Sequence, residues 1–299
     1  MHLIITFILI PEGSSMSTDK NYLLHYQNER LNFGYSISHP PFAPRHLHTH
    51  TRCEIFCVFR GNGHYITEGS RYKFESGRII LMRPGEIHMA ADIPDSPREA
   101  LTIQFDPSII DHFDPQHKLL SPFFDRPLGL NNVYDRLAVT QTEIYSLFQK
   151  MCALSENSDD SCIHCTALLF SVLSELKHLF DDKLYMHSAN SVDTMHMLID
   201  YVNQNLNIDL IPDQLCEKFH LSRAQLDRNF KHYTGSTLWT YITAKRLLLA
   251  KDYIAEGMHA TEAAIACGFK NYPTFYRAYY RNFGHAPTSK ETPGHKIYL

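Results

Sequence analysis

The first half of the chain alternates short apolar and polar stretches, with glycine and proline between them. Apolar alternations such as Glu54-Ile-Phe-Cys-Val-Phe and Arg78-Ile-Ile-Leu-Met are separated by turn signals such as Arg60-Gly-Asn-Gly. Closely spaced strands of this kind are typical of an antiparallel barrel or sandwich. We therefore expect an antiparallel β-barrel over residues 20–134.

After about residue 135 the apolar period changes from two to nearly four, which is the period of a helix. Five apolar residues form one stripe along the predicted helix: Cys165, Leu169, Val172, Leu176 and Leu179. Such a stripe either covers one end of the barrel or pairs with a second copy of the chain. The sequence leaves both open, and we assign residues 135–181 to a helical dimerisation segment. The polar residues 182–190 follow as a linker.

The last part of the chain, residues 191–299, reads as helix throughout. Pro212 suits the first turn of one helix, and Ser222 and Gln225 have the spacing of a capping box at the start of the next. Three further helices are expected at about 237–254, 260–267 and 272–283. The predicted fold class is therefore α+β with two domains, an N-terminal β-barrel with helices and a C-terminal all-α domain.

The composition is that of a globular chain whose charge is unevenly placed. Hydrophobic residues make up 44% and charged residues 20% of the 299 residues, which excludes a disordered or collagen-like chain. The net charge is -4, yet residues 191–299 contain 12 Lys and Arg against 10 Asp and Glu. A mildly basic C-terminal part behind an acidic remainder indicates two different tasks.

The cysteines and the N-terminal residues indicate in which cellular compartment the protein acts. Seven scattered cysteines do not form a disulfide framework, which favours a reducing cytoplasm. The apolar run at residues 3–10 is too short to span a bilayer and lacks the basic segment of a signal peptide, so no membrane partner is expected. We interpret residues 1–19 as an extension or a short arm.

A helix, a tight turn and a second helix occur twice near the C-terminus, over residues 212–231 and 260–283. One such pattern is a weak signal, because ordinary helical hairpins imitate it. Two copies joined by a helix of about 18 residues, roughly 27 Å long, are a stronger one. That length is close to one turn of DNA, so the two second helices would reach successive major grooves.

In each second helix, a buried pair defines the exposed face. Leu226 and Phe230 are four residues apart and must point inward, as must Phe275 and Tyr279. The opposite faces carry two sets of residues: Ala224, Asp227, Arg228, and Pro273, Tyr276, Arg277. Each face offers an arginine suited to guanine O6 and N7. Four basic residues lie at the groove edge, near phosphates: Arg223, Lys231, Lys270 and Arg281.

This segment resembles the DNA-binding domain of AraC/XylS transcriptional regulators. The matching residues are Leu215, Leu221-Ser222, Leu226, Phe230-Lys231, Thr234-Gly235, Tyr241-Ile242, Arg246-Leu247, Ala250, Thr261-Glu262, Ala266-Cys-Gly-Phe269, Phe275, Arg277, Phe283-Gly284 and Pro287. Ala260, Pro273 and Cys216 depart from the usual residues. The resemblance implies that the two exposed faces identified above contact base edges.

A histidine-rich stretch, His46-Leu-His-Thr-His-Thr-Arg-Cys-Glu54, lies in the predicted barrel. Alternate residues of a strand share one face, so these side chains and His88 would converge inside the barrel. The spacing of His48, His50, Glu54 and Gly61 resembles the first cupin motif, whereas Arg83-Pro-Gly departs from the second. We expect seven effector-binding residues: His46, His48, His50, Arg52, Glu54, Arg83 and His88. No cofactor is expected, and a divalent metal held by His48, His50, Glu54 and His88 is the alternative.

The favoured interpretation is a ligand-responsive transcription regulator with no catalytic residues. Its expected partners are double-stranded promoter DNA, a small-molecule effector of the sugar class, a second copy of the chain in a homodimer, and RNA polymerase. The alternative is a cupin metalloenzyme, a dioxygenase or sugar isomerase, with a helical appendage. That alternative leaves the duplicated helix-turn-helix without an explanation. A barrel that only dimerises, with no effector, is a third interpretation.

Overall fold

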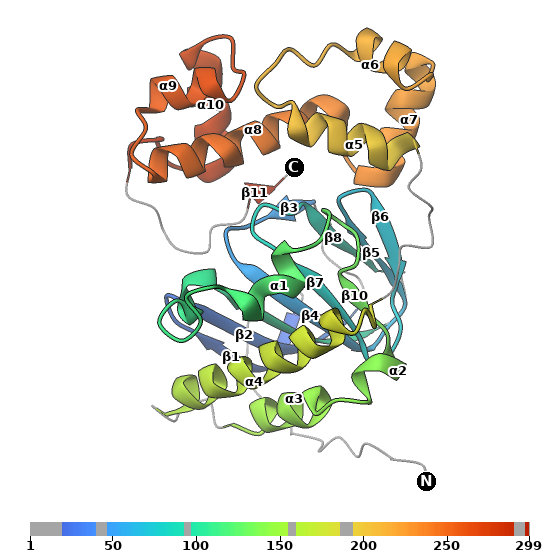
Figure 1. The fold of residues 1–299 in the computed structure, drawn as a ribbon, viewed down its shortest axis with the longest axis vertical. Helices are drawn as coiled ribbons and strands as arrows, with labels where there is room; N and C mark the ends of the chain where they lie inside the picture. The colour runs from blue at the N-terminus through green and yellow to red at the C-terminus, as the bar shows by residue number, and fades with distance from the viewer. Residues whose placement is uncertain are drawn as a thin grey trace.

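The computed structural model describes residues 20–39, 47–92, 97–154, 160–185, 194–289 and 297–298. A β-sheet domain with its own helices lies on one side and a helical domain on the other (Figure 1). The predicted two-domain α+β architecture is confirmed. The expected arm at residues 1–19 and the residues 186–190 of the linker lie outside the described residues.

Two antiparallel sheets form the N-terminal domain. The first has the order β1 (Lys20–Gln27), β2 (Leu31–Ser38), β9 (Arg98–Phe105), β4 (Cys53–Arg60), β7 (Arg78–Met82), β10 (Val133–Tyr134). The second has the order β11 (Ile297–Tyr298), β3 (His48–Thr49), β8 (His88–Asp92), β5 (Gly63–Thr67), β6 (Ser70–Lys73). The strands predicted from the alternating sequence pattern are therefore present in the structure.

The central strand β4 is buried on both faces, and its two faces belong to different cores. Ile55 and Cys57 pack in the core beneath the helices, whereas Phe56 and Val58 pack in the core between the sheets. Because side chains alternate across a strand, Glu54 points to the same side as Phe56. A carboxylate is thus placed among apolar and aromatic side chains inside the domain.

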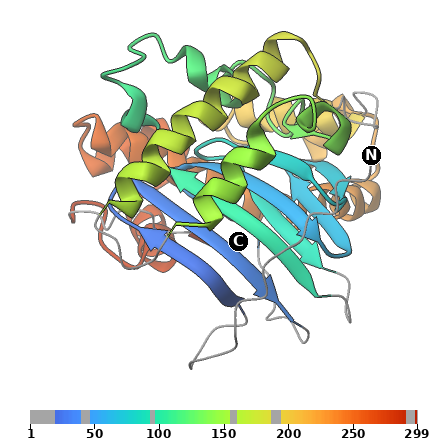
Figure 2. The same cartoon turned by 90° about the horizontal axis from the view of Figure 1, so that it is seen from below.

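Helices cover the outer face of the first sheet, as Figure 2 shows from below. They are α1 (Ser121–Phe124), α2 (Arg136–Val139), α3 (Ile144–Cys152) and α4 (Ser161–Asp181), with 3-10 turns at Pro107–Ile110 and Lys118–Leu120. The apolar stripe of α4 is buried in the same core as β2, β4 and β9. The stripe therefore packs against the β-sheet of its own chain. It offers no support for a homodimer, which stays a prediction.

The C-terminal domain contains α5 (Thr194–Gln204), α6 (Pro212–Lys218), α7 (Arg223–Thr234), α8 (Leu238–Ala255), α9 (Ala260–Ala266) and α10 (Tyr272–Phe283). Every predicted helix is present with bounds within a few residues of those expected. Two separate apolar cores hold it, one around Leu226 and Phe230 and one around Phe275 and Tyr279. Each helix-turn-helix thus has its own core, and α8 joins them.

The end of the chain departs from the all-helical expectation. Residues Ile297–Tyr298 form strand β11, which pairs antiparallel with β3 at the edge of the second sheet. The chain thus returns from the helical domain to the β-sheet domain (Figure 1). No helix among the described residues has the length and apolar character needed to cross a membrane.

Candidate functional site

The second helix of the first helix-turn-helix, α7, starts at a complete capping box. The Ser222 side chain accepts from the Gln225 backbone N–H, and the Gln225 side chain accepts from the Ser222 backbone N–H. These reciprocal bonds fix where the helix begins and hence which residues face outward. Leu226 and Phe230 are buried, and the predicted base-reading residues Ala224, Asp227 and Arg228 are exposed.

The last helix, α10, has the same arrangement. Asn271 caps it by accepting from the Thr274 backbone N–H at 3.0 Å. Phe275 and Tyr279 are buried. The predicted base-reading residues of this copy, Pro273, Tyr276 and Arg277, are all exposed. The burial argument from spacing is therefore confirmed for both helices, while contact with bases stays a prediction.

Helix α8 sets the separation of the two helix-turn-helix units. It has 18 residues, and α7 and α10 lie near its opposite ends (Figure 1). The buried Arg246 on α8 donates to the carbonyls of Leu206 at 2.8 Å and Ile208 at 2.6 Å. A guanidinium that bridges two carbonyls after α5 ties that segment to α8. The two halves are thereby joined by a braced helix and not by a loose linker.

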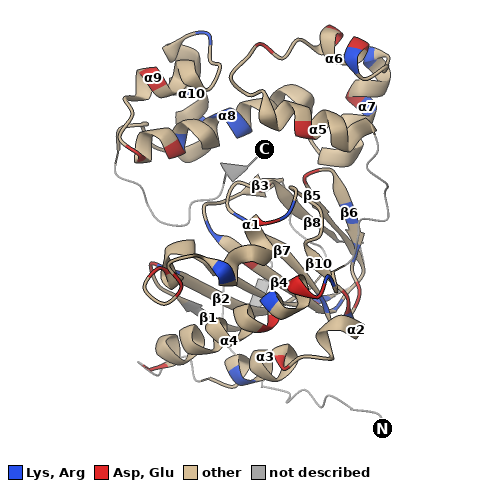
Figure 3. Cartoon of the chain, viewed as in Figure 1, with Lys and Arg blue, Asp and Glu red and all other residues tan. Residues whose placement is uncertain are grey.

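The four residues predicted to contact phosphates are exposed: Arg223, Lys231, Lys270 and Arg281. Two of them form surface ion pairs, Arg223 with Asp227 at 3.1 Å and Lys270 with Asp209 at 2.9 Å. Exposed ion pairs contribute only about 0–1 kcal/mol, so DNA phosphates can replace these carboxylates at low cost. Figure 3 shows acidic and basic residues mixed over the helical domain.

In the β-sheet domain, three of the predicted sensor residues meet. His50, Glu54 and His88 each offer a ligand atom, and these atoms lie within 4.8 Å of one another. His50 Nε2 lies 2.9 Å and His88 Nε2 3.9 Å from Glu54 Oε2. The three residues are at most 5% exposed, so water screens their interactions little. This group of three is called the His/Glu cluster below.

Two neighbours orient the Glu54 carboxylate. Gln104 Nε2 donates to Glu54 Oε2 at 2.5 Å, and the Tyr65 hydroxyl donates to Oε1 at 3.3 Å. Burial, and next the charge of Glu54, raise the pKa of Tyr65 well above its usual value, so the hydroxyl stays a donor. The carboxylate is therefore held by Gln104 on β9, the strand beside β4, and by Tyr65 on β5 of the facing sheet, in addition to its contact with His50.

The other predicted sensor residues fall in different places. His46 lies outside the described residues. The partly buried His48 has its ring centroid 4.4 Å from that of His88 but is not among the three mutually close ligands. Arg52 donates to the Glu29 carbonyl at 2.7 Å, in the turn between β1 and β2. Arg83 donates to the carbonyls of Phe124 and Arg126.

The expected single face of alternating residues is interrupted, which explains the position of Arg52. Strand β3 ends at Thr49 and β4 begins at Cys53, with a bend between them. Alternation holds only within one continuous strand. Arg52 therefore turns away from the His/Glu cluster, and an effector-binding role for Arg52 and Arg83 stays a prediction.

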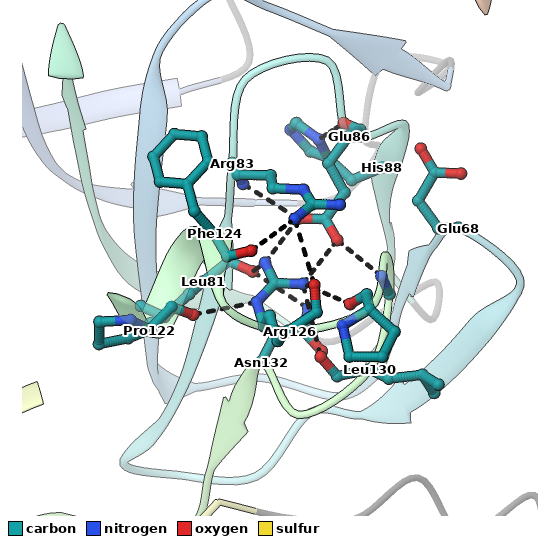
Figure 4. A network of polar contacts seen from close by, with 12 residues as sticks. Glu68, Leu81, Arg83, Glu86, His88, Pro122, Phe124, Arg126, Leu130 and Asn132 are labelled. Atoms are coloured by element: carbon teal, nitrogen blue, oxygen red, sulfur yellow. Dashed lines mark hydrogen bonds and ion pairs between the residues drawn. The ribbon is translucent and has the colours of Figure 1, made fainter. Parts of the chain in front are cut away.

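A buried ion pair supports the loop between β7 and β8, residues Arg83–Ile87, which precedes His88 (Figure 4). Arg126 contacts Glu86 with two nitrogens, at 2.8 and 2.7 Å, and both side chains are fully buried. Burial alone would raise the pKa of Glu86. The Arg126 charge and hydrogen bonds from Arg126, Gly129 and Arg83 outweigh burial and lower that pKa to about 2.

The same loop meets the helical domain. Glu68 follows β5 with a φ of 42°, and Gly69 after it has a φ of 88°, so the β5–β6 hairpin turns tightly there. The Glu68 carboxylate is buried between this hairpin and the helical domain. Glu68 accepts from the Ile87 backbone N–H at 2.8 Å, from the Tyr241 hydroxyl and from Lys245 Nζ. Lys245 Nζ also donates to the Gly85 carbonyl at 3.0 Å.

Apolar side chains surround these polar contacts. Leu47, Ile66 and Ile87 of the β-sheet domain share one core with residues of α5, α7 and α8. The Ser70 hydroxyl lies 3.1 Å from His196 Nε2 on α5. Burial, and next the charge of Glu68, raise the pKa of Tyr241 well above its usual value, which keeps it a neutral donor. The first helix-turn-helix is thus packed against the β-sheet domain.

Comparison with known families matches both domains. A helix-turn-helix domain model matches residues 215–290, and the AraC-like ligand binding domain model matches residues 40–173. The chain belongs to the AraC family of transcription regulators. The matched ranges contain α7 and α10 on one side and the His/Glu cluster on the other. This is a family of regulators and not of enzymes.

Two curated transcriptional activators are similar to this chain over most of its length. The HTH-type transcriptional activator RhaR of Yersinia pseudotuberculosis serotype O:1b (strain IP 31758) is 24% identical over 245 residues, 80% of this chain and 82% of the relative. RhaR of Enterobacter sp. (strain 638) is 26% identical over 255 residues, 80% of this chain and 84% of the relative. Both relatives are thus matched over most of their length.

Two solved structures are similar at low identity. ToxT from Vibrio cholerae O395 is 14% identical, with coverage of 87% of this chain and 96% of that one and a TM-score of 0.35. The DNA-binding domain of AdpA in complex with a target DNA is 23% identical, with 32% and 86% coverage and a TM-score of 0.31. At such TM-scores neither likeness says anything further about this AraC-family chain.

Several important residues of this AraC-family chain are not predicted from its sequence. Glu68, Glu86 and Arg126 carry no motif, and Lys245 lies 177 residues from its partner Glu68. The sequence does mark Glu68 and Gly69 as a turn, and a carboxylate in a turn is expected to be exposed. Glu68 is buried because the helical domain packs against that turn, which the sequence does not show.

Replacing Arg126 with alanine should destabilise the β-sheet domain by about 3–5 kcal/mol, because Glu86 would be left buried without its counter-charge. Urea unfolding followed by tyrosine fluorescence and circular dichroism measures the shift. The control is Arg30→Ala, an exposed arginine whose removal should cost less than about 0.5 kcal/mol. Equal midpoints for the two variants would contradict the structural role of the Glu86–Arg126 pair.

Proposed function

We propose that the chain is a ligand-responsive, sequence-specific regulator that reads promoter DNA with α7 and α10. The observation that carries this proposal is the pair of exposed faces, each with one arginine, at opposite ends of the braced helix α8. Arg228 and Arg277 would each donate two hydrogen bonds to a guanine, and Tyr276 offers an apolar ring for a thymine methyl. Asp227 would accept from a cytosine amino group once Arg223 moves to a phosphate.

Arg228→Ala and Arg277→Ala should each cost about 1–3 kcal/mol of specific binding, or roughly 5- to 150-fold in Kd. The probe is duplex DNA selected from a random pool by the purified full chain, titrated by fluorescence anisotropy at fixed salt. Arg30→Ala, an exposed arginine of the β-sheet domain, serves as the matched control. Wild-type affinity in an arginine variant would remove that residue from base reading.

The phosphate contacts make a different prediction. Lys231→Ala and Arg281→Ala should weaken binding to selected and unselected duplexes alike, and each should reduce the slope of log K against log salt by about 1. The measurement is the same titration repeated at several salt concentrations. A loss seen only with the selected duplex would instead place the residue among the base readers.

The effector side of the proposal is centred on the His/Glu cluster. We propose a small effector of the carbohydrate class, acting in the cytoplasm, with a homodimer and RNA polymerase as further partners. The resemblance to AraC-type regulators supports the effector class, and RhaR, a named transcriptional activator, supports the regulatory role. A hydroxyl-bearing effector would approach from the side of His48, which is only partly buried whereas His50, Glu54 and His88 are buried. A thermal-shift panel of sugars on the full chain tests the class.

We further propose that the effector acts through the contact between the domains. An effector changes the equilibrium only if it binds two arrangements with different affinity. The packed arrangement seen here is one of them, and Glu68 with Lys245 stabilises it. Gly85 connects the two sites, since its N–H donates to the His50 carbonyl at 3.0 Å while its carbonyl accepts from Lys245.

Glu68→Gln and Lys245→Met should each loosen the packing of the two domains, because each leaves one buried charge unpaired. We expect amide hydrogen exchange in β5–β6 and α8 to become faster by about 100-fold or more. The double variant should lose less than the sum of the single ones. Lys270→Met, which removes an exposed pair with Asp209, should change exchange by less than about fivefold. Additive effects in the double variant would contradict a direct Glu68–Lys245 interaction.

A further inference from the structure

Helices α7 and α10 can be compared residue by residue, because the chain folds both in the same way. Each has 12 residues, begins after a side chain that caps its first turn, and ends at a left-handed glycine with a φ of 74° or 76°. The caps, the buried pairs, the exposed arginines and the final glycines all correspond: Ser222 with Asn271, Leu226 with Phe275, Phe230 with Tyr279, Arg228 with Arg277, and Gly235 with Gly284.

One row of residues differs between the two helices in its chemistry. It consists of three positions spaced four residues apart, next to the shared arginine. On α7 all three are charged: Arg223, Asp227 and Lys231. On α10 all three are tyrosine: Tyr272, Tyr276 and Tyr280. These are named the charged row and the tyrosine row below. The same backbone framework thus offers ionic groups at one end of α8 and aromatic rings at the other.

The tyrosine row is an ordered surface on the side of α10 away from its core. Tyr276 and Tyr280 are 39% and 54% exposed. Their rings are stacked, with centroids 6.4 Å apart and an angle of 18° between the planes, and the Tyr272 ring centroid lies 6.1 Å from that of Tyr276. Aromatic rings at such distances attract each other, so neighbours restrict one another's orientation. Because Tyr280 follows Arg277 by three residues, these rings share the exposed face with that arginine.

The charged row of α7 behaves differently. Arg223 Nε lies 3.1 Å from Asp227 Oδ2, and Arg223 also lies 3.6 Å from Asp213. Such groups exchange hydrogen bonds with polar base edges and phosphates. Aromatic rings gain most by covering apolar surface, and the apolar group that the major groove presents is the 5-methyl group of thymine. The two rows are therefore suited to different features of a duplex.

We propose that the tyrosine row makes the half-site of α10 depend on a thymine methyl group, whereas the half-site of α7 is read without one. The ring of Tyr276 covers the methyl group, since the N-terminal half of a reading helix lies deepest in the groove. Tyr280, one turn further along, is a positioning residue that fixes the Tyr276 ring by stacking on it. The inference rests on the proposed function, because it requires α10 to lie in a major groove.

The experiment replaces each thymine in turn by deoxyuridine in a duplex selected from a random pool by the purified full chain. Deoxyuridine lacks only the 5-methyl group and keeps every hydrogen-bonding atom. Each half-site is assigned by the guanine whose replacement no longer matters in Arg228→Ala or in Arg277→Ala. At one thymine or more of the α10 half-site we expect about fourfold weaker binding, which corresponds to one buried methyl group. Thymines of the α7 half-site should have no effect.

Three variants separate contact from positioning. Tyr276→Ala should bind the thymine and deoxyuridine duplexes equally well. Tyr280→Ala should reduce the discrimination, and Tyr280→Phe, which keeps the ring, should retain it. The matched control is Lys231→Ala, at the position of α7 that corresponds to Tyr280. It should weaken binding to both duplexes alike and leave their ratio unchanged. Circular dichroism of each variant verifies that the chain is folded.

The outcomes distinguish this inference from the proposed function. An α10 half-site without thymine would overturn the inference, as would equal binding of the two duplexes by the wild type, or discrimination that survives in Tyr276→Ala. If Arg277→Ala still loses specific binding in those cases, α10 reads DNA without its tyrosine row and the proposed function stands. If Arg277→Ala binds like the wild type, α10 does not read bases and both proposals fail.

Discussion

The buried pair between Glu86 and Arg126 is the interaction on which the rest of the structure depends. An ion pair without access to water is stable only if its remaining donors and acceptors are satisfied. Here the carboxylate also accepts from two backbone N–H groups, and the guanidinium also donates to the Pro122 and Leu81 carbonyls. The loop Arg83–Ile87 is thereby held in one conformation, and both the His/Glu cluster and the helical domain contact it.

On one side of that loop lies the His/Glu cluster, and on the other lies the DNA-binding domain. The Glu86 carbonyl orients His88, while the neighbouring Gly85 carbonyl accepts from Lys245. A ligand at the cluster that moved His50 or His88 by a fraction of an ångström would displace backbone that also contacts Glu68. Packed interfaces respond to such shifts by switching between discrete arrangements. A rigid loop between two sites is therefore a short physical route for coupling.

The helical domain could be predicted from the sequence, whereas the arrangement of the predicted effector-binding residues could be predicted only in part. Periodicity and capping residues fix α7 and α10 locally, so the exposure of Arg228 and Arg277 follows without knowing any other part of the fold. The sequence could not predict what the apolar stripe of α4 packs against, because its partners are strands distant in the chain. It could not predict the position of Arg52 either, because a bend between β3 and β4 interrupts the alternation of side chains. Strand β11 and the Glu68–Lys245 pair are likewise set by the packing of two domains, which no local pattern records.

The His/Glu cluster shows what spacing in the chain leaves open. Spacing predicts that His50, Glu54 and His88 lie on one side of the barrel, but it does not predict how each ring is turned. In the folded chain the backbone carbonyls of Arg52 and Glu86 accept from the Nδ1 atoms of His50 and His88, and His50 Nε2 lies 2.9 Å from Glu54 Oε2. The Glu86 carbonyl belongs to the loop that Arg126 holds in place, so the orientation of the His88 ring depends on a residue 38 positions further along the chain. No local pattern of histidines records that dependence.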